Sequence, residues 1–170
     1  MDASVIAEDD VIIGQAGIVP GDAAYQALLG RADIMAMTQK AQAAALLPED
    51  PGGLSHAERA ALAVRVARLH GDAGLAAHYA TLMARAGAGA SVAALADPAF
   101  KGGEDARLVV LIAYTDLVSL APKDTVAGDI EALQAAGIAD ADIVRLAELT
   151  AFLAYQIRVV AGLKLMQATA

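Results

Sequence analysis

The sequence predicts an all-α protein, and three features of its 170 residues lead to this fold class. The hydrophobic fraction is 58%, whereas aromatic residues contribute only 4%, so alanine, leucine and valine supply most of the apolar mass. Alanine and leucine lead the scale of helix propensity. Apolar residues also recur at helical spacing, and no segment alternates in the way that predicts a strand. We expect a compact domain of about seven or eight helices.

The first third of the chain is predicted to be partly irregular. Residues 1–20 show no helical pattern. Residues 23–47 predict one helix, or two helices with a break at Gly30. The segment "PEDPGG" (residues 48–53) follows and is predicted to be a linker, because two prolines and two glycines cannot continue a helix.

The length is typical of a single domain, and 170 residues can bury a core without disulfides or metals. We therefore expect one domain over residues 1–170. Within it, residues 1–53 are predicted to form an N-terminal helical arm with its linker. Residues 54–170 are predicted to form the core.

A helical hairpin is predicted to open this core. Ser55 is a good N-cap, and Glu58 three residues later completes the pattern of a capping box. Gly71 is predicted to end the first helix, because glycine accepts the left-handed conformation found after helix ends. The second helix is predicted over residues 72–86.

Four more helices are predicted after the hairpin. A short one covers residues 91–97, and residues 102–122 are apolar on nearly all sides, which predicts a central buried helix. Residues 125–137 predict a shorter helix that ends at a glycine. The last helix is predicted to begin near Ala139 and to run past Leu163, a length of roughly 40 Å at ~1.5 Å per residue.

The composition excludes several classes of function. The chain has no cysteine, which excludes disulfides, thiolate metal sites and thiol nucleophiles. Its net charge of −8 disfavours nucleic acids as partners. The start, "MDASVIAEDD", lacks the basic and apolar regions of a signal peptide. The longest uncharged runs have about 12 residues, fewer than the ~20 that a membrane span needs. We expect a soluble, cytoplasmic protein that binds neither nucleic acid nor membrane.

Two segments resemble one known family. The segment "LSHAERAALAVRVARLHGDAGLAAHY" (residues 54–79) is similar to the carboxymuconolactone decarboxylase / alkylhydroperoxidase D family. The usual form there is Leu-Ser-x-x-Glu-Arg-Glu, an apolar helix, Asn-Gly-Cys-x-x-Cys, and a histidine four residues after the second cysteine. Residues 128–163 resemble the family's C-terminal part in order and spacing. The segments "DVIIGQAGIVPGD" (residues 10–22) and "LHGDAGLAAHY" (residues 69–79) resemble a cysteine-lacking subgroup of this family.

This resemblance implies a compact all-α fold and a homo-oligomer, because the family assembles as dimers, trimers or hexamers. Thiol-bearing members reduce hydroperoxides, with a glutamate and a histidine relaying protons to the cysteine pair. Decarboxylase members act on a lactone without a cofactor. Members of the cysteine-lacking subgroup accompany, or are fused to, a cysteine-bearing relative. The resemblance thus implies no cofactor and a cysteine-bearing relative as a partner.

The family's reactive positions fall on other residue types here. Without a gap in the alignment, the two thiols fall on Asp72 and Leu75. The relay glutamate then falls on Ala60, and the relay histidine falls on Tyr79.

With one residue deleted in the turn, the thiols fall on Gly71 and Gly74, and His78 takes the relay position. Both alignments remove both thiols. Peroxide reduction needs a thiolate of low pKa, so we expect that peroxidase activity is lost. Whether the protein is an enzyme stays open at this point.

Three residues are candidates for catalysis: His78, Tyr79 and Arg158. His78 could act as a general acid or base. Alternatively, it is a core histidine bonded to a backbone carbonyl. Arg158 could hold a substrate carboxylate. Alternatively, it forms a buried ion pair, for which Asp116 on the apolar helix is the natural partner.

Four residues are candidates for lining a pocket: His70, Asp72, Asp116 and Tyr155. His70 could form a second wall near His78, or it could simply favour the dipole at its helix end. Asp72 could be the N-cap of the following helix and could pair with Arg68. A metal site made of the two histidines and Asp72 matches no known spacing, so we expect no metal.

Three functions are consistent with these residues. The first is a structural or regulatory partner of a cysteine-bearing relative. The second is a thiol-independent lyase or decarboxylase that acts on a small carboxylated substrate, with His78 as acid or base. The third is a module that binds a small carboxylated or lipophilic molecule.

Overall fold

The computed structural model describes residue 6 and residues 10–169, and all regular structure in this part of the chain is helical. The fold class is therefore all-α. The described residues form nine α-helices and one 3-10 turn: α1 (Val11–Ala16), α2 (Ala23–Leu29), α3 (Ala32–Leu46), α4 (His56–Leu69), α5 (Ala73–Arg85), α6 (Ala90–Ala94), α7 (Ala106–Leu120), η1 (Pro122–Asp124), α8 (Ala127–Ala135) and α9 (Asp140–Ala168).

Local signals set most of the helix ends. The Ser55–Glu58 capping box is present: the Ser55 hydroxyl accepts from the Glu58 N–H at 3.2 Å, and the Glu58 carboxylate accepts from the Ser55 N–H at 2.9 Å. After α4, Gly71 has a φ of 72°, as predicted for the residue that ends this helix. Residues 23–47 form two helices, α2 and α3, with Gly30 between them.

Helix α1 corrects the expectation that residues 1–20 are irregular; residues 1–5 and 7–9 of this segment lie outside the described residues. The Asp10 carboxylate starts α1 by accepting hydrogen bonds from the N–H groups of Ile12 at 2.8 Å and Ile13 at 3.1 Å. Ile12, Ile13 and Ala16 are buried. Helix α1 has only six residues, too few to show a helical period in the sequence.

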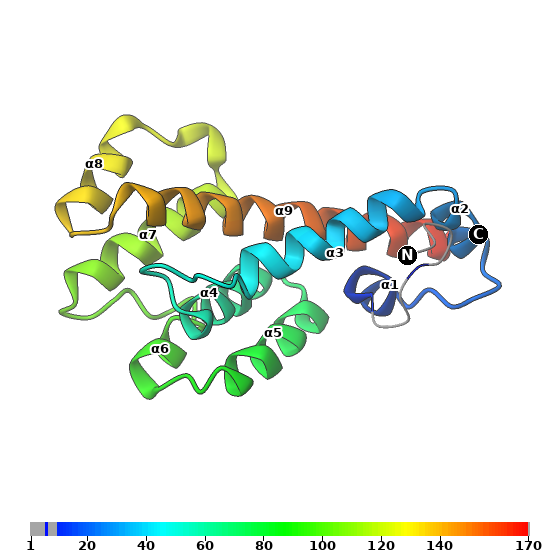
Figure 1. Ribbon diagram of the computed structural model, residues 1–170, viewed down its shortest axis with the longest axis horizontal. Helices are drawn as coiled ribbons and strands as arrows, with labels where there is room; N and C mark the ends of the chain where they lie inside the picture. The colour runs from blue at the N-terminus through cyan, green and yellow to red at the C-terminus, as the bar shows by residue number, and fades with distance from the viewer. Residues whose placement is uncertain (1–5, 7–9, 170) are drawn as a thin grey trace.

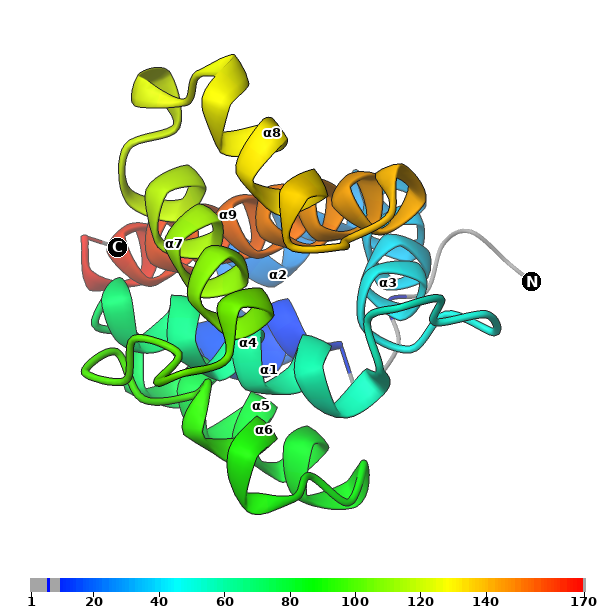
Figure 2. The same ribbon diagram turned by 90° about the vertical axis from the view of Figure 1, so that its left-hand side faces the viewer.

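The long helix α9 is the axis on which the other helices pack (Figure 1). It contacts α1, α2, α3, α4, α7 and α8. Figure 1 shows α3 running beside α9, with α1 and α2 near the C-terminal end of α9 and with α7 and α8 near its other end. In the end-on view, α5 and α6 lie on the side of α4 away from α8 (Figure 2).

Two clusters of buried side chains hold these helices together. The main cluster joins α4, α5, α7 and α9. The second cluster joins the N-terminal helices to the end of α9, where Ile12 and Met35 pack with Val160 and Leu163. The N-terminal arm is thus packed against the same long helix as the core.

The most deeply buried helix is α4, whereas the sequence favours α7. On α7, Val109 is 38% exposed and Leu120 is 55% exposed, so only one face of this helix is covered. Helix α4 is surrounded by α3, α5, α6, α7 and α9. Its small alanine side chains, such as Ala60 and Ala63, let these neighbours approach closely from several sides.

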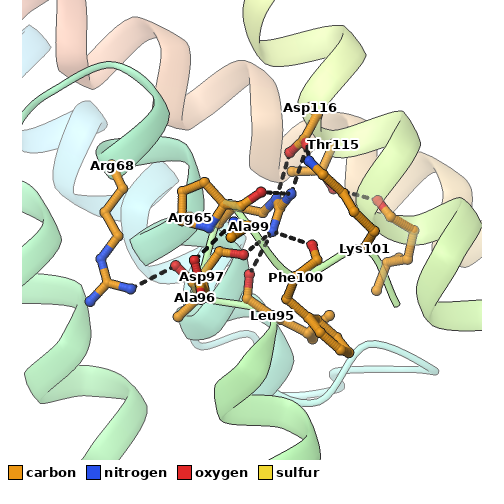
Figure 3. Close-up of polar contacts among 12 residues, drawn as sticks. Arg65, Arg68, Leu95, Ala96, Asp97, Ala99, Phe100, Lys101, Thr115 and Asp116 are labelled. Carbon is orange, nitrogen blue, oxygen red and sulfur yellow. Dashed lines mark hydrogen bonds and ion pairs between the residues drawn. The ribbon is translucent and has the colours of Figure 1, made fainter. Parts of the chain in front are cut away.

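A buried arginine on α4 anchors the segment between α6 and α7 (Figure 3). The fully buried Arg65 side chain pairs with Asp116 of α7, with Nε–Oδ1 at 2.5 Å and Nη2–Oδ2 at 2.7 Å. The same guanidinium also donates to backbone carbonyls of that segment, including Asp97 at 2.5 Å and Phe100 at 3.2 Å. These bonds satisfy a charge that would otherwise be costly to bury.

Helix α9 is the one helix in the described part of the chain that is long and apolar enough to cross a membrane, judged by length and composition. A core helix of a soluble protein meets the same criteria. Here α9 packs against six other helices.

Candidate functional site

A cavity of about 480 Å³ lies between the start of α1, one face of α3 and one face of α5. This volume lies within the range of small-molecule sites, ~300–1,000 Å³. Six of its lining residues are polar: Asp10, Thr38, Gln39, Gln42, His78 and Arg85. Six are apolar: Val11, Ile12, Ala43, Leu46, Leu47 and Leu82.

Helical spacing brings these side chains to the cavity. On α5, His78, Leu82 and Arg85 follow the spacing i, i+4, i+7, so they share one face. On α3, Thr38 and Gln42 are also one turn apart, and the remaining α3 residues of the lining lie beside them. The predicted arm thus supplies two walls of the cavity, and the predicted core supplies the third.

A chain of buried hydrogen bonds leads from the core to this cavity. The Tyr79 hydroxyl donates to the Gln156 side-chain oxygen. The Gln156 Nε2 donates to the Gln42 Oε1 at 2.8 Å, and Gln42 lines the cavity. Tyr79 and Gln156 are both fully buried. Burial raises the pKa of Tyr79 well above its usual value, so the phenol stays protonated and available as a donor.

The cavity lining holds one cationic side chain, Arg85, and one carboxylate, Asp10, and the two are not paired with each other. Arg85 is exposed at the end of α5 and forms no ion pair with a described residue. Burial lowers the pKa of His78, and the nearby charge of Arg85 lowers it further. At neutral pH the imidazole is therefore neutral, with one donor and one acceptor nitrogen.

The Asp10 carboxylate keeps its negative charge, but both of its oxygens already accept hydrogen bonds from the protein. One oxygen accepts from the N–H groups of Ile12 and Ile13, and the other accepts from the Gln39 Nε2 at 2.9 Å. The carboxylate thus caps α1, and Asp10 is 3% exposed. The groups left to meet a ligand are the Arg85 guanidinium, the Gln42 amide and the His78 ring.

The structure separates two of the three predicted catalytic residues from the cavity. His78 lines it, whereas the neighbouring Tyr79 points into the core. Arg158 is exposed on α9, and its Nη1 donates to the Ala154 carbonyl of the same helix at 2.9 Å. The expected pair between Arg158 and Asp116 is not formed, because Asp116 bonds to the buried Arg65.

Two of the predicted pocket residues lie at helix ends. His70 is exposed at the C-cap of α4 and does not line the cavity. Asp72 is the N-cap of α5, as expected, and accepts from the Leu75 N–H at 2.9 Å. Its ion pair is with Lys164 at 3.6 Å rather than with Arg68, whose Nη1 donates to the Ala96 carbonyl.

Tyr155, the last pocket candidate, lies outside the cavity. Its hydroxyl is 3.0 Å from the Thr38 Oγ1, and Thr38 itself lines the cavity. Tyr155 also borders a separate shallow apolar depression with Met37 and Phe152. Within residue 6 and residues 10–169, no three histidine, aspartate or glutamate side chains gather in a way that could hold a metal ion.

Among the polar residues of the lining, only His78 was predicted from the sequence; the others, Asp10, Thr38, Gln39, Gln42 and Arg85, were not, nor was Gln156 behind them. Arg85 could have been found, because it lies seven residues after His78 on the same predicted helix face. Gln42 lies in the arm, and Gln156 lies far along the last helix. Gln42 and Gln156 come close together only through tertiary packing, which cannot be predicted from a local sequence pattern.

No protein-family model matches the chain, and no curated protein matches it.

Proposed function

We propose that the protein is a thiol-less relative of the carboxymuconolactone decarboxylase / alkylhydroperoxidase D family that binds a small organic anion with an apolar body. The resemblance of residues 54–79 and 128–163 supports the family, and the composition of the cavity lining carries the binding function. Leucine, isoleucine and valine side chains suit an apolar body. The Arg85 guanidinium, with the His78 and Gln42 side chains on the same lining, suits an anionic head such as a carboxylate.

The turn between α4 and α5 supports a function other than redox chemistry. Both alignments place the family's thiols on residues of this turn and of the start of α5. Here Asp72 caps α5, and the left-handed Gly71 closes α4. Both residues have local structural roles, and neither side chain can act as a thiolate nucleophile.

The test compares three probes that share one apolar chain and differ in their head group: octanoate, octanamide and octylammonium. Isothermal titration calorimetry with the full chain measures each affinity. We expect octanoate to bind most tightly and octylammonium most weakly. Octylammonium binding as tightly as octanoate would contradict the proposal.

Arg85→Ala is expected to weaken octanoate binding by about threefold to tenfold, because a charge-assisted hydrogen bond is lost at a partly solvated position. Octanamide binding should change less, because its head group is neutral. Arg31→Ala is the matched control: it removes the same charge from an exposed arginine at the start of α3, away from the cavity. An equal loss of octanoate affinity in both variants would exclude a direct role for Arg85.

A second candidate function is a thiol-independent acid–base enzyme, which the position of His78 favours. A neutral imidazole on the wall of an apolar cavity can accept a proton from a bound molecule. Deuterium exchange next to the carbonyl of small keto acids and lactones, followed by NMR in D₂O, tests this activity. Exchange should be lost in His78→Gln. Exchange at the same rate in both proteins would exclude His78 as the base.

A further inference from the structure

We propose that the hydrogen-bond chain Tyr79–Gln156–Gln42 has a positioning role: it holds the Gln42 amide so that its N–H groups face the cavity. The cavity then prefers ligands whose head group accepts hydrogen bonds. This inference rests on the proposed function, since it concerns the ligand of the same cavity. Tyr79 and Gln156 do not line that cavity, and their hydrogen bonds reach it through Gln42.

The direction of the chain follows from its buried end. Glutamine oxygen and nitrogen atoms are assigned from their hydrogen bonds, so a chain of two amides has two self-consistent directions. In one direction Tyr79 donates to Gln156; in the other it accepts from Gln156. The second direction leaves the phenol proton without an acceptor, because no other described group bonds to the Tyr79 oxygen. An unpaired donor in a fully buried position is costly, so Tyr79 donates.

Each following bond is then fixed. Because the Gln156 oxygen accepts the phenol proton, its Nε2 faces Gln42 and donates to the Gln42 Oε1 at 2.8 Å. The Gln42 oxygen is thereby occupied. Its Nε2 makes no hydrogen bond to another described residue, so it remains to donate to a ligand in the cavity.

The cavity therefore offers mainly donors to a ligand. The Arg85 guanidinium has no acceptor, the Gln42 amide presents its N–H groups, and the Asp10 oxygens are already bonded. A carboxylate or another acceptor matches this arrangement. An ammonium head would face the N–H groups of Gln42 and the like charge of Arg85, while the one carboxylate of the lining, Asp10, is already bonded to Gln39 and to the start of α1. This mismatch lets the cavity discriminate against cations.

Tyr79→Phe tests the positioning role, because it removes the phenol proton that sets the direction. Without the phenol, each direction keeps only the bond between Gln156 and Gln42, so both directions become populated and part of the molecules present the Gln42 oxygen to the cavity. We expect the preference for octanoate over octylammonium to fall by about tenfold. The matched control is Tyr114→Phe, which removes a phenol hydroxyl from a buried tyrosine on α7 that does not line the cavity. This control should keep the wild-type preference.

Gln42→Glu provides a second, nearly isosteric variant. One oxygen of the introduced carboxylate can still accept from the Gln156 Nε2, while the other presents an acceptor to the cavity. We expect this variant to prefer octylammonium. A wild-type preference in both Tyr79→Phe and Gln42→Glu would overturn the positioning role while leaving the binding function intact.

A measurement without ligand separates the two proposals. Solvent exchange of the side-chain amide protons, followed by NMR, should be slow for the bonded proton of Gln156 and fast for Gln42. In Tyr79→Phe, exchange at Gln42 should slow, because part of the molecules then donate from Gln42 to the Gln156 oxygen. If no probe binds the wild-type protein, the proposed function is wrong, and this exchange pattern still decides the orientation. Slow exchange at Gln42 in the wild-type protein would overturn the positioning role.

Discussion

At the scale of single residues, His78 and Tyr79 have different surroundings because successive side chains on a helix point about 100° apart. His78 therefore meets the cavity beside Leu82, whereas Tyr79 enters the core and bonds to Gln156. Their rings still touch edge to face, with centroids 5.1 Å apart. The core tyrosine thus forms part of the support behind the cavity wall.

The lowered pKa of His78 predicts a pH dependence of stability. Burial, followed by the charge of Arg85, lowers the pKa of His78 below its usual value of 6.5. The unfolded state then binds a proton more readily than the folded state. The free energy of unfolding therefore falls as the pH drops through 6.5, and this loss is complete below the folded pKa.

His78→Gln should remove this contribution. Urea denaturation at a series of pH values from about 7.5 to about 5 gives the free energy of unfolding of both proteins. We expect the wild-type protein to lose more stability than the variant on acidification. Parallel curves would mean that the burial of His78 has no effect on its titration.

Residue roles could be predicted where the partner is close in sequence. The Ser55–Glu58 capping box and the Asp72 N-cap each involve groups three residues apart, and both are present. The Arg65–Asp116 pair joins groups 51 residues apart and was not predicted. The sequence predicted Arg158 as the partner of Asp116, and the packing of α4 against α7 brings Arg65 to it instead.

At the scale of elements, Arg65 connects α4 and α7 with the segment that follows α6. Arg65→Met should lower the free energy of unfolding by about 3–5 kcal/mol, because it leaves the Asp116 carboxylate and several carbonyls without their main donor. Arg68→Met is the control, since Arg68 is exposed and donates to one carbonyl. Equal losses in urea denaturation would show that the buried pair adds nothing beyond a surface arginine.

The turn between α4 and α5 gives a second prediction at this scale. Gly71 has a φ of 72°, so Gly71→Ala should cost about 1–2 kcal/mol. Gly162→Ala is the matched change, and it should have the opposite effect on stability. Gly162 lies inside α9 with open space around its Cα, so alanine there should stabilise by roughly 0.5–1 kcal/mol. Thermal denaturation of both variants checks this contrast, and a stabilising Gly71→Ala would contradict it.

Most helices could be predicted, because their apolar spacing and end signals are local. Helix α1 could not, since it is short and begins at the Asp10 side chain. The burial of α7 was overestimated for a different reason: an apolar composition does not tell which face a neighbouring helix covers. Val109 and Leu120 remain exposed on the uncovered side.

At the scale of the whole molecule, the site could be predicted only in part, because the cavity lies between the predicted arm and the predicted core. His78 was a candidate because it lies within the segment that resembles the family. Gln42 and Gln39 come from α3, and Asp10 comes from the start of α1. The packing of these helices against α9 creates the cavity, and such long-range contacts leave no periodic signal in the sequence.

The predicted homo-oligomer and the predicted cysteine-bearing partner stay predictions. Several large apolar side chains are exposed on the single chain, among them Met37 at 54%, Leu165 at 66% and Met166 at 51%. Native mass spectrometry of the protein from its own host would give the subunit count and reveal a bound relative.

The binding of an organic anion in the cavity is tested most directly by an NMR titration of the wild-type protein with octanoate. We expect saturable shifts in the His78 ring, the Gln42 side-chain amide and the Leu82 methyl groups. Residues outside the cavity, such as Tyr114, should not shift. No saturable shift at the cavity, or equal shifts with octylammonium, would contradict the proposed function.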